Sequence, residues 1–359
     1  MEKFSIQKKV LHDKETEKEI WEIGFQENSE CVANYFYNQS FSPDERYFIF
    51  ASDRNGKVEL YRMEVDGDEA VRITENFNQW YCWKVYNQEV ICNDGETFFA
   101  INIFDLSKRI ISKKTDDNAI IYGTPVVSGD GNKIACLYQK DNSVWSIVCA
   151  ELKGSELFDV YKFDSKYHHV SHLQCAPAEN FILTFAPLPD RQNNFNLPPS
   201  ERARAWKLDI EKGVAEPFLI MPVGYRATHE YWGQKNNERL YFHKKTVPNF
   251  TPTSIASIDI HGNDLRVHFF SENRKLGHSF VSPDTRFMVS DVQEPGNNEL
   301  YLIDMQTGKS EILCWPDSSC SSQRNQLGHV HPSFSSKGNY IIYSSDRTVK
   351  TKVYIIPLK

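Results

Sequence analysis

The chain has 359 residues, of which 40% are hydrophobic and 25% are charged, and its formal net charge is −7 at pH 7. This composition is typical of a globular protein with a large apolar core. The negative charge argues against a general nucleic-acid-binding surface, and no segment is apolar over the length of a membrane span. The first residues lack the apolar stretch of a secretory signal, so we expect a cytoplasmic protein with neither nucleic-acid nor membrane partners.

One pattern recurs seven times along the chain. A short apolar strand is followed by a turn of Ser, Pro, Asp, Gly or Asn, and then by further apolar strands such as residues 47–50 and 299–303. Four short strands per repeat are typical of a β-propeller blade. We therefore predict an all-β fold, a seven-bladed β-propeller with four-stranded antiparallel blades. The repeats begin at Asn38, Tyr81, Thr124, His172, His229, His278 and His331.

Residues 4–10 are strand-like and precede the first full repeat, whereas the last repeat ends soon after Ile356. We expect this N-terminal strand to pair in the last blade, because closing the ring protects the sheet edges. No linker or charge run divides the chain. The sequence therefore predicts one propeller domain over residues 1–359.

Two groups of residues are interpreted as structural. Asp44, Asp130 and Asp284 lie in Ser-Pro-Asp or Gly-Asp-Gly turns, where hairpins need turn-forming side chains. The eight cysteines show no CxxC spacing, and we expect them to be buried thiols.

Histidine occupies the same position in four successive repeats. The first strand of a propeller blade lines the central channel, so His172, His229, His278 and His331 are expected to converge. A shared polar lining of the channel is the plainer interpretation. Glu230 directly follows His229, and strand alternation predicts that it faces away, so we do not expect a catalytic carboxylate there.

The last repeat adds a second histidine. His329 and His331 are two residues apart, and alternating strand side chains would place both on one side. Gln326 could supply an amide oxygen from the entering loop. Together with His278 this makes three imidazoles and one oxygen, a donor set that suits Mn, Fe, Ni or Zn. No nucleophile elbow, phosphate loop or dinucleotide fingerprint occurs in the chain.

Three stretches, residues 34–37, 228–232 and 326–334, resemble the oligogalacturonate lyase family. Members of this family are cytoplasmic seven-bladed enzymes of pectin breakdown. The resemblance implies a Mn²⁺ site, with other divalent metals as alternatives. It also implies a β-elimination that cleaves short oligogalacturonides and leaves 4,5-unsaturated uronates. By this resemblance the metal ligands are His278, Gln326, His329 and His331, the catalytic base is His229, and Arg204 lies beside the base.

Three further residues are candidates for contact with a uronate oligosaccharide: His172, Arg226 and Arg324. Val32 and Ala33 stand where the family carries basic residues, and the loop at residues 293–298 looks short. These departures leave open a related lyase for another uronate-containing oligosaccharide. A non-enzymatic propeller that binds other molecules is a further alternative, because fold alone does not determine function. The sequence does not report the oligomeric state.

Overall fold

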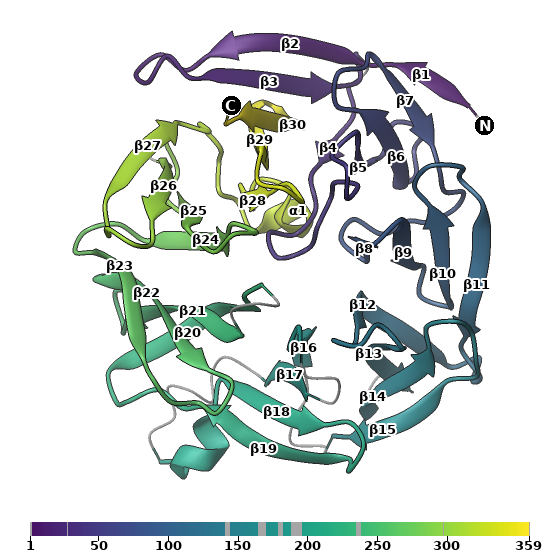
Figure 1. Cartoon of the computed structure of the whole chain (residues 1–359), viewed down its shortest axis with the longest axis vertical. Helices are drawn as coiled ribbons and strands as arrows, with labels where there is room; N and C mark the ends of the chain where they lie inside the picture. The colour runs from purple at the N-terminus through teal and green to yellow at the C-terminus, as the bar shows by residue number, and fades with distance from the viewer. Residues whose placement is uncertain are drawn as a thin grey trace. The chain divides into compact units, whose positions relative to one another are not determined.

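The computed structural model describes residues 2–26, 28–140, 144–163, 170–178, 182–187, 196–234, 238–296 and 298–358. The chain divides into two compact units. One comprises Met1–Val90, Ile101–Ser107 and Arg274–Lys359, and the other comprises Ile91–Ala100 and Lys108–Asn273. Each unit is built from antiparallel sheets (Figure 1).

The first unit contains three complete sheets. One has the order β1 (Lys3–Ser5), β7 (Glu69–Arg72), β6 (Glu59–Glu64), β5 (Tyr47–Ser52), β4 (Cys31–Val32). The next has the order β2 (Gln7–His12), β3 (Glu19–Gly24), β30 (Lys350–Pro357), β29 (Tyr340–Thr348), β28 (Ser333–Phe334). The third is a meander of β24 (Leu276–Val281), β25 (Phe287–Val292), β26 (Leu300–Asp304) and β27 (Ser310–Cys314).

The second unit contains three more meanders of four strands. The first consists of β12 (Ala119–Val127), β13 (Lys133–Lys140), β14 (Val144–Glu151) and β15 (Phe158–Lys162). The second consists of β16 (Val170–Cys175), β17 (Ile182–Pro187), β18 (Ala205–Asp209) and β19 (Val214–Leu219). The third consists of β20 (Tyr225–Trp232), β21 (Arg239–Thr246), β22 (Thr253–Asp259) and β23 (Arg266–Ser271).

The residues of one further sheet are divided between the two units. This sheet consists of β8 (Trp83–Tyr86), β9 (Glu89–Asn93), β10 (Thr97–Asn102) and β11 (Lys108–Lys113). A single turn of 3-10 helix, Pro199–Arg202, and a single α-helical turn, α1 (Gln323–Gln326), interrupt the strands. Within the described residues, no helix has the length and apolar character needed to cross a membrane.

The predicted architecture of seven uniform four-stranded blades, closed by residues 4–10, is wrong. Two of the sheets have five strands. Phe4 pairs with Ala70 in the sheet of β7, and the strand beside β30 is β3, in which Trp21 pairs with Ile355. Figure 1 shows the purple N-terminal strands β2 and β3 next to the yellow C-terminal strand β30. The repeat pattern missed this hairpin because β2 and β3 precede the first repeat, so no register relates them to β30.

Apolar side chains from facing sheets form the core of each unit. In the first unit, Phe25, Phe48 and Phe50 pack with Val353 and Ile355 from the sheet of β30. Burying a side chain of this size stabilises the fold by about 1.5–3 kcal/mol. In the second unit, a similar cluster joins the sheets of β12 and β16.

The turn aspartates have the structural role predicted for them. In the first repeat, Ser42 donates its hydroxyl hydrogen to Asp44 at 2.6 Å and accepts a hydrogen bond from the Tyr47 N–H at 3.0 Å. Ser128 with Asp130 and Ser282 with Asp284 repeat this arrangement. None of the eight cysteines forms a disulfide. Five are buried as predicted, whereas Cys82, Cys175 and Cys320 are partly exposed, so the prediction of buried thiols holds only in part.

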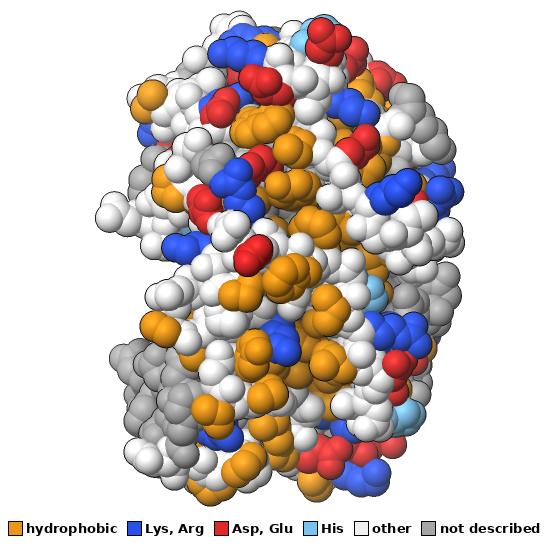
Figure 2. All heavy atoms as spheres, turned by 90° about the vertical axis from the view of Figure 1, so that its left-hand side faces the viewer, with side chains coloured by type: hydrophobic (Ala, Val, Ile, Leu, Met, Phe, Trp, Pro, Cys, Tyr) orange, Lys and Arg blue, Asp and Glu red, His pale blue; other side chains and the backbone are white. Residues whose placement is uncertain are grey.

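The outer strands expose part of their apolar surface. In the second unit, Val214 on β19 and Phe270 on β23 are each 60% exposed. Figure 2 looks onto the side where β23 lies in Figure 1, and hydrophobic side chains are visible there among charged ones. β19 and β23 are the edge strands of their sheets, so each has a neighbouring strand on one side only.

Candidate functional site

Three histidines of the first unit converge. One ligand atom from each of His278, His329 and His331 lies within 4.8 Å of the others. The ring centroids of His278 and His331 are 4.3 Å apart, and those of His329 and His331 are 5.4 Å apart. The sequence predicted this convergence, although its reason was partly wrong. Residues 329–331 are not in a strand, and His331 has a φ of 47°, so alternation along a strand does not bring their rings together.

A buried carboxylate holds the first of these histidines. Asp291 on β25 accepts the main-chain N–H of His278, and its Oδ2 lies 3.1 Å from the ring Nδ1. His278 sits where the pairing of β24 with β25 shifts register between Leu276 and Ser279. When Nδ1 donates to the carboxylate, the lone pair of the neutral ring is on Nε2. A carboxylate behind a histidine in this way is common at metal sites, where it fixes the tautomer of the ligand.

The other two histidines favour the neutral form that binds metals. Burial lowers the pKa of His331 well below its usual value, and the charges of His278 and His329 lower it further. Burial also lowers the pKa of His329, although the carboxylates of Asp291 and Asp346 oppose the shift. Both ring nitrogens of His331 are buried without a hydrogen-bond partner among the described residues. Such unsatisfied atoms are costly unless something else binds them, so this donor set fits a divalent metal.

Aromatic rings surround the histidine cluster on the side of residues 34–37. The ring of Tyr35 lies 4.5 Å from that of His331, and the ring of Phe36 lies 5.1 Å from that of His278. Tyr81 meets His331 edge to face at 5.7 Å. These contacts fix the imidazole planes by packing. They also account for one of the stretches on which the family resemblance depends.

The predicted fourth ligand, Gln326, lies at the end of α1 with a φ of 62° and an exposed side chain. Its main-chain carbonyl accepts hydrogen bonds from the His329 N–H at 3.0 Å and from the Tyr81 hydroxyl at 3.4 Å. Its amide as a metal ligand stays a prediction. The side chain of Arg324 lies outside the described part of the chain. Gln293, which the sequence did not single out, places its amide nitrogen 3.4 Å from the ring of His329.

A second cluster, in the other unit, joins Arg204, Glu230 and His172. Arg204 donates from Nε to Glu230 Oε1 at 2.6 Å and from Nη2 to Oε2 at 2.8 Å. Nη2 also lies 3.0 Å from His172 Nδ1. The guanidinium and the carboxylate are each only 4% exposed. Two parallel, charge-assisted hydrogen bonds of this kind fix the plane of the guanidinium.

The sequence did not single out Glu230 for the site, and a β-bulge lies where the structure brings it to Arg204 and His172. The pairing of β20 with β21 shifts register between Thr228 and Tyr231, and His229 has a φ of 55°. His172 has a φ of 53° at the equivalent shift between Ser171 and Gln174. An extra residue in one strand breaks the alternation of side chains and re-aims them. A positive φ is costly for a residue other than glycine, and such strain gathers at functional sites.

The residues around Glu230 lower its pKa and so favour its charged form. Burial alone would raise the pKa of Glu230, but the charge of Arg204, its two hydrogen bonds to the carboxylate and the neighbouring His172 ring outweigh burial and lower the pKa to about 2. Glu230 is therefore ionised at neutral pH. The sequence offered one sign of this role, since Glu230 is a charged residue directly before two large aromatic residues, Tyr231 and Trp232.

The remaining candidates lie on the same strand as Glu230. His229 is half-buried, and its ring meets that of the buried His243 at 5.6 Å and 80°. The guanidinium of Arg226 lies 5.8 Å from the centre of the Phe250 ring. The roles of His229 as a base and of Arg226 in substrate binding stay predictions.

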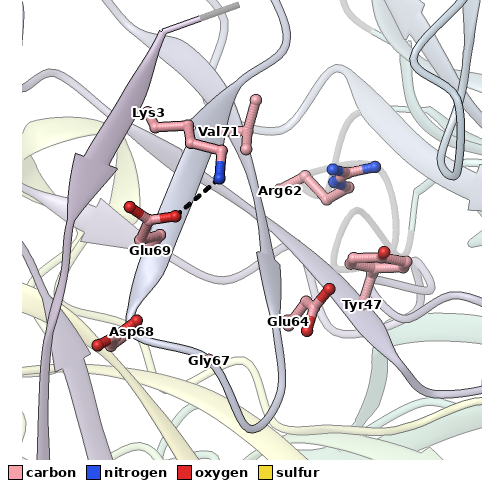
Figure 3. A pocket seen from close by; sticks show the side chains of 8 residues that line it. All are labelled: Lys3, Tyr47, Arg62, Glu64, Gly67, Asp68, Glu69 and Val71. Carbon is pink, nitrogen blue, oxygen red and sulfur yellow. Dashed lines mark hydrogen bonds and ion pairs between the residues drawn. The ribbon is translucent and has the colours of Figure 1, made fainter.

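A surface cavity of about 220 Å³ lies on the sheet of β1, β7 and β6 in the first unit and is not a candidate site. Figure 3 shows the side chain of Lys3 pointing toward Glu69, and their charged atoms are 2.9 Å apart. Arg62 donates to the carbonyls of Ile103 and Phe104, each at 2.8 Å. The cations of this cavity already have partners, so they are not set up to recognise an anion.

Comparisons with known proteins point to one family. An oligogalacturonate lyase of Dickeya dadantii is 20% identical over 366 residues, which cover 90% of this chain and 89% of the relative. An oligogalacturonide lyase of Pectobacterium atrosepticum is 21% identical over 364 residues, with the same coverage. A solved structure described as oligogalacturonate lyase in complex with manganese superposes with a TM-score of 0.86 at 17% identity, covering 100% of this chain and 98% of that one. This similarity shows that the fold is an all-β propeller. No family model matches the sequence.

Proposed function

Given the similarity of this chain to oligogalacturonate lyases over nine-tenths of its length, we propose that it is a metal-dependent lyase that cleaves short oligogalacturonides by β-elimination. The observation that carries the proposal is the cluster of His278, His329 and His331, with Asp291 behind the first of them. The two curated relatives match nine-tenths of the chain, and both are named for lysis of the same class of substrate. The substrate would therefore be a uronate oligosaccharide, and the alternative of a non-enzymatic propeller is set aside.

The metal would be held by the three imidazoles and by the amide oxygen of Gln326. Mn²⁺ is the ion we propose, because the structure similar to this chain is described as a manganese complex. Once bound, it would supply a positive charge that offsets the C6 carboxylate of the uronate and so makes the neighbouring C5 proton easier to remove.

His229 is the proposed base. An imidazole has an ordinary pKa of about 6.5 and is mostly neutral at pH 7, so it can accept the C5 proton. Departure of the C4 oxygen would then leave a 4,5-unsaturated uronate. The resemblance also assigns Arg204 to the catalytic machinery. Its bidentate pairing with Glu230 and its 4% exposure favour a positioning role over direct contact with the substrate.

We propose that His172, Arg226 and Arg324 bind the rest of the substrate. Val32 and Ala33, which replace basic residues of the family, are both buried. The identity of the sugar is therefore the part of the proposal that most needs a direct test. The cytoplasmic location also stays a prediction.

The test is incubation of the manganese-loaded protein with saturated and unsaturated digalacturonate, with the products identified by mass spectrometry. We expect an unsaturated monouronate from either substrate. Turnover of another uronate disaccharide in place of digalacturonate would redirect the proposal to a related lyase. No turnover of any uronate, together with no metal in the purified protein, would contradict it.

A further inference from the structure

The buried pair of Arg204 and Glu230 has a third partner that a simple ion pair does not need. Besides its two bonds to the carboxylate, Arg204 Nη2 lies 3.0 Å from His172 Nδ1. His172 is the accessible member of the group, with 20% side-chain exposure against 4% for Glu230. The pair therefore contacts a residue that a dissolved molecule can reach.

The contact with Arg204 determines which nitrogen of His172 carries the proton. A guanidinium has N–H donors and no acceptor, so His172 Nδ1 must accept the hydrogen bond. The proton of the neutral imidazole is then on Nε2. In the competing arrangement, a proton on His172 Nδ1 would be donated to Glu230 Oε2, but these two atoms are 3.5 Å apart. This arrangement would also turn an N–H toward the permanently charged guanidinium, so the shorter contact with Arg204 prevails.

Contacts with the main chain join the strands that carry the group. Gln174, two residues after His172 on β16, donates to the Glu230 carbonyl at 2.6 Å and accepts the Trp232 N–H at 3.2 Å. The Arg204 N–H donates to the Leu219 carbonyl at 2.7 Å. The left-handed backbone of His172 fixes the direction of its Cβ as well. The three side chains thus have few alternative arrangements.

From these contacts we infer that Glu230 and Arg204 position His172 as a fixed Nε2–H donor for an acceptor oxygen of the substrate. Glu230 orients the guanidinium, and the guanidinium sets the tautomer of His172. Because Nδ1 keeps its lone pair to accept from Arg204, the Nε2–H donor belongs to an uncharged imidazole and not to a cation. In a uronate, the matching groups are carboxylate and hydroxyl oxygens. This choice of substrate class rests on the proposed function, whereas the tautomer does not.

The tautomer is tested by NMR of the full-length protein labelled with ¹⁵N-histidine and loaded with diamagnetic Zn²⁺. The signals of His172 are identified by their loss in His172→Gln. We expect Nδ1 to have the ¹⁵N shift of an unprotonated nitrogen and Nε2 that of a protonated one. A protonated Nδ1 in the wild-type protein would overturn the inference, whatever the variants do.

The role of Glu230 is tested by the same spectrum of Glu230→Gln, in which the neutral amide no longer fixes the guanidinium. We expect both tautomers of His172 in this variant, and a single unchanged tautomer would overturn the positioning role. If Glu230→Gln does not fold, Glu230→Asp, which shortens the carboxylate arm and keeps its charge, replaces it with the same expectation.

Kinetics then separate this inference from the proposed function. A hydrogen bond to a charged oxygen is equivalent to about a tenfold change in affinity or more, so His172→Ala should raise KM about tenfold and leave kcat nearly unchanged. His172→Gln, which keeps an N–H donor, should recover part of the loss, and equal effects of the two variants would contradict donation. Absence of turnover with the expected tautomer present would count against the lyase only. Turnover with a protonated Nδ1 would count against the positioning only.

Discussion

Asp291 contacts His278 at two points, through the main-chain N–H and through the ring Nδ1 at 3.1 Å. Both residues are 1% exposed, so water does not compete for either hydrogen bond. The double contact fixes the backbone and the ring of His278 together, and the Nε2 lone pair points away from the carboxylate. One aspartate thereby sets the geometry of one corner of the histidine cluster.

Asp291→Asn should weaken metal binding without unfolding the protein. The amide group can accept the main-chain N–H, but its NH₂ would then face the Nδ1–H of His278, so the ring must turn or change tautomer. Loss of such a supporting partner typically lowers metal affinity about 10- to 100-fold. Competition with a chelator would measure the change. Asp284→Asn, in a turn of the same sheet, is the matched control, and equal affinities of the two variants would contradict the role of Asp291.

Gly277→Ala should also disturb the contact between Asp291 and His278. A Cβ at this position would lie 2.6 Å from Asp291 Oδ1 and 3.0 Å from the Cβ of Gln293. The carboxylate must move, and we expect both weaker metal binding and a loss of about 1–3 kcal/mol in the free energy of unfolding. Urea denaturation and the chelator titration measure the two effects. In the control Gly56→Ala, the strain of a φ of 76° should lower stability but leave metal affinity unchanged.

Substitution of two histidines should separate proton transfer from metal binding. His229→Ala should abolish turnover of digalacturonate and keep the metal content of the wild type, because the proposed base is not a ligand. His331→Ala should lose metal and activity together. Metal analysis of the purified variants and a product assay give the two readouts, with the exposed His261→Ala as control. Normal turnover in His229→Ala would refute the assignment of the base.

His268 should make the second unit sensitive to acid. Its Nε2 is hydrogen-bonded to the Ser257 hydroxyl at 2.7 Å, and Arg239 donates to the same hydroxyl at 2.8 Å. Burial, and then the charges of Arg239 and Arg266, lower the pKa of His268 to about 4. The unfolded chain, with a histidine pKa of about 6.5, binds more protons between these values, so stability should fall as the pH drops from about 6.5 to 4.

The contribution of His268 is measured against a variant. Because the side chain is partly exposed, we expect the loss to be about 1–2 kcal/mol. The free energy of unfolding of the wild type and of His268→Phe, measured in urea at pH 7, 6 and 5, should converge as the pH falls. Parallel curves would show that the pKa of His268 is the same in the folded and unfolded states.

Much of the candidate site was visible as a pattern in the chain. The histidines at equivalent repeat positions and the His-x-His at residues 329–331 pointed to the cluster that the structure contains. The supporting residues were not visible in this way. Asp291 and Gln293 became relevant only through the pairing of β25 with β24 and the approach of the loop that carries His329.

Local sequence was sufficient for the turns of the repeats, because side-chain hydrogen bonds such as that of Ser282 with Asp284 act within a few residues. It also pointed to His278, His329 and His331, whereas Gln326 as a ligand stays a prediction. Tertiary structure decided the strand next to β30, the burial of Glu230 and the partner of His278. Each of these depends on register between strands. A bulge such as the one at His229 forms only when a neighbouring strand imposes it, and once it forms, side chains beyond it no longer follow the alternation that the sequence predicts.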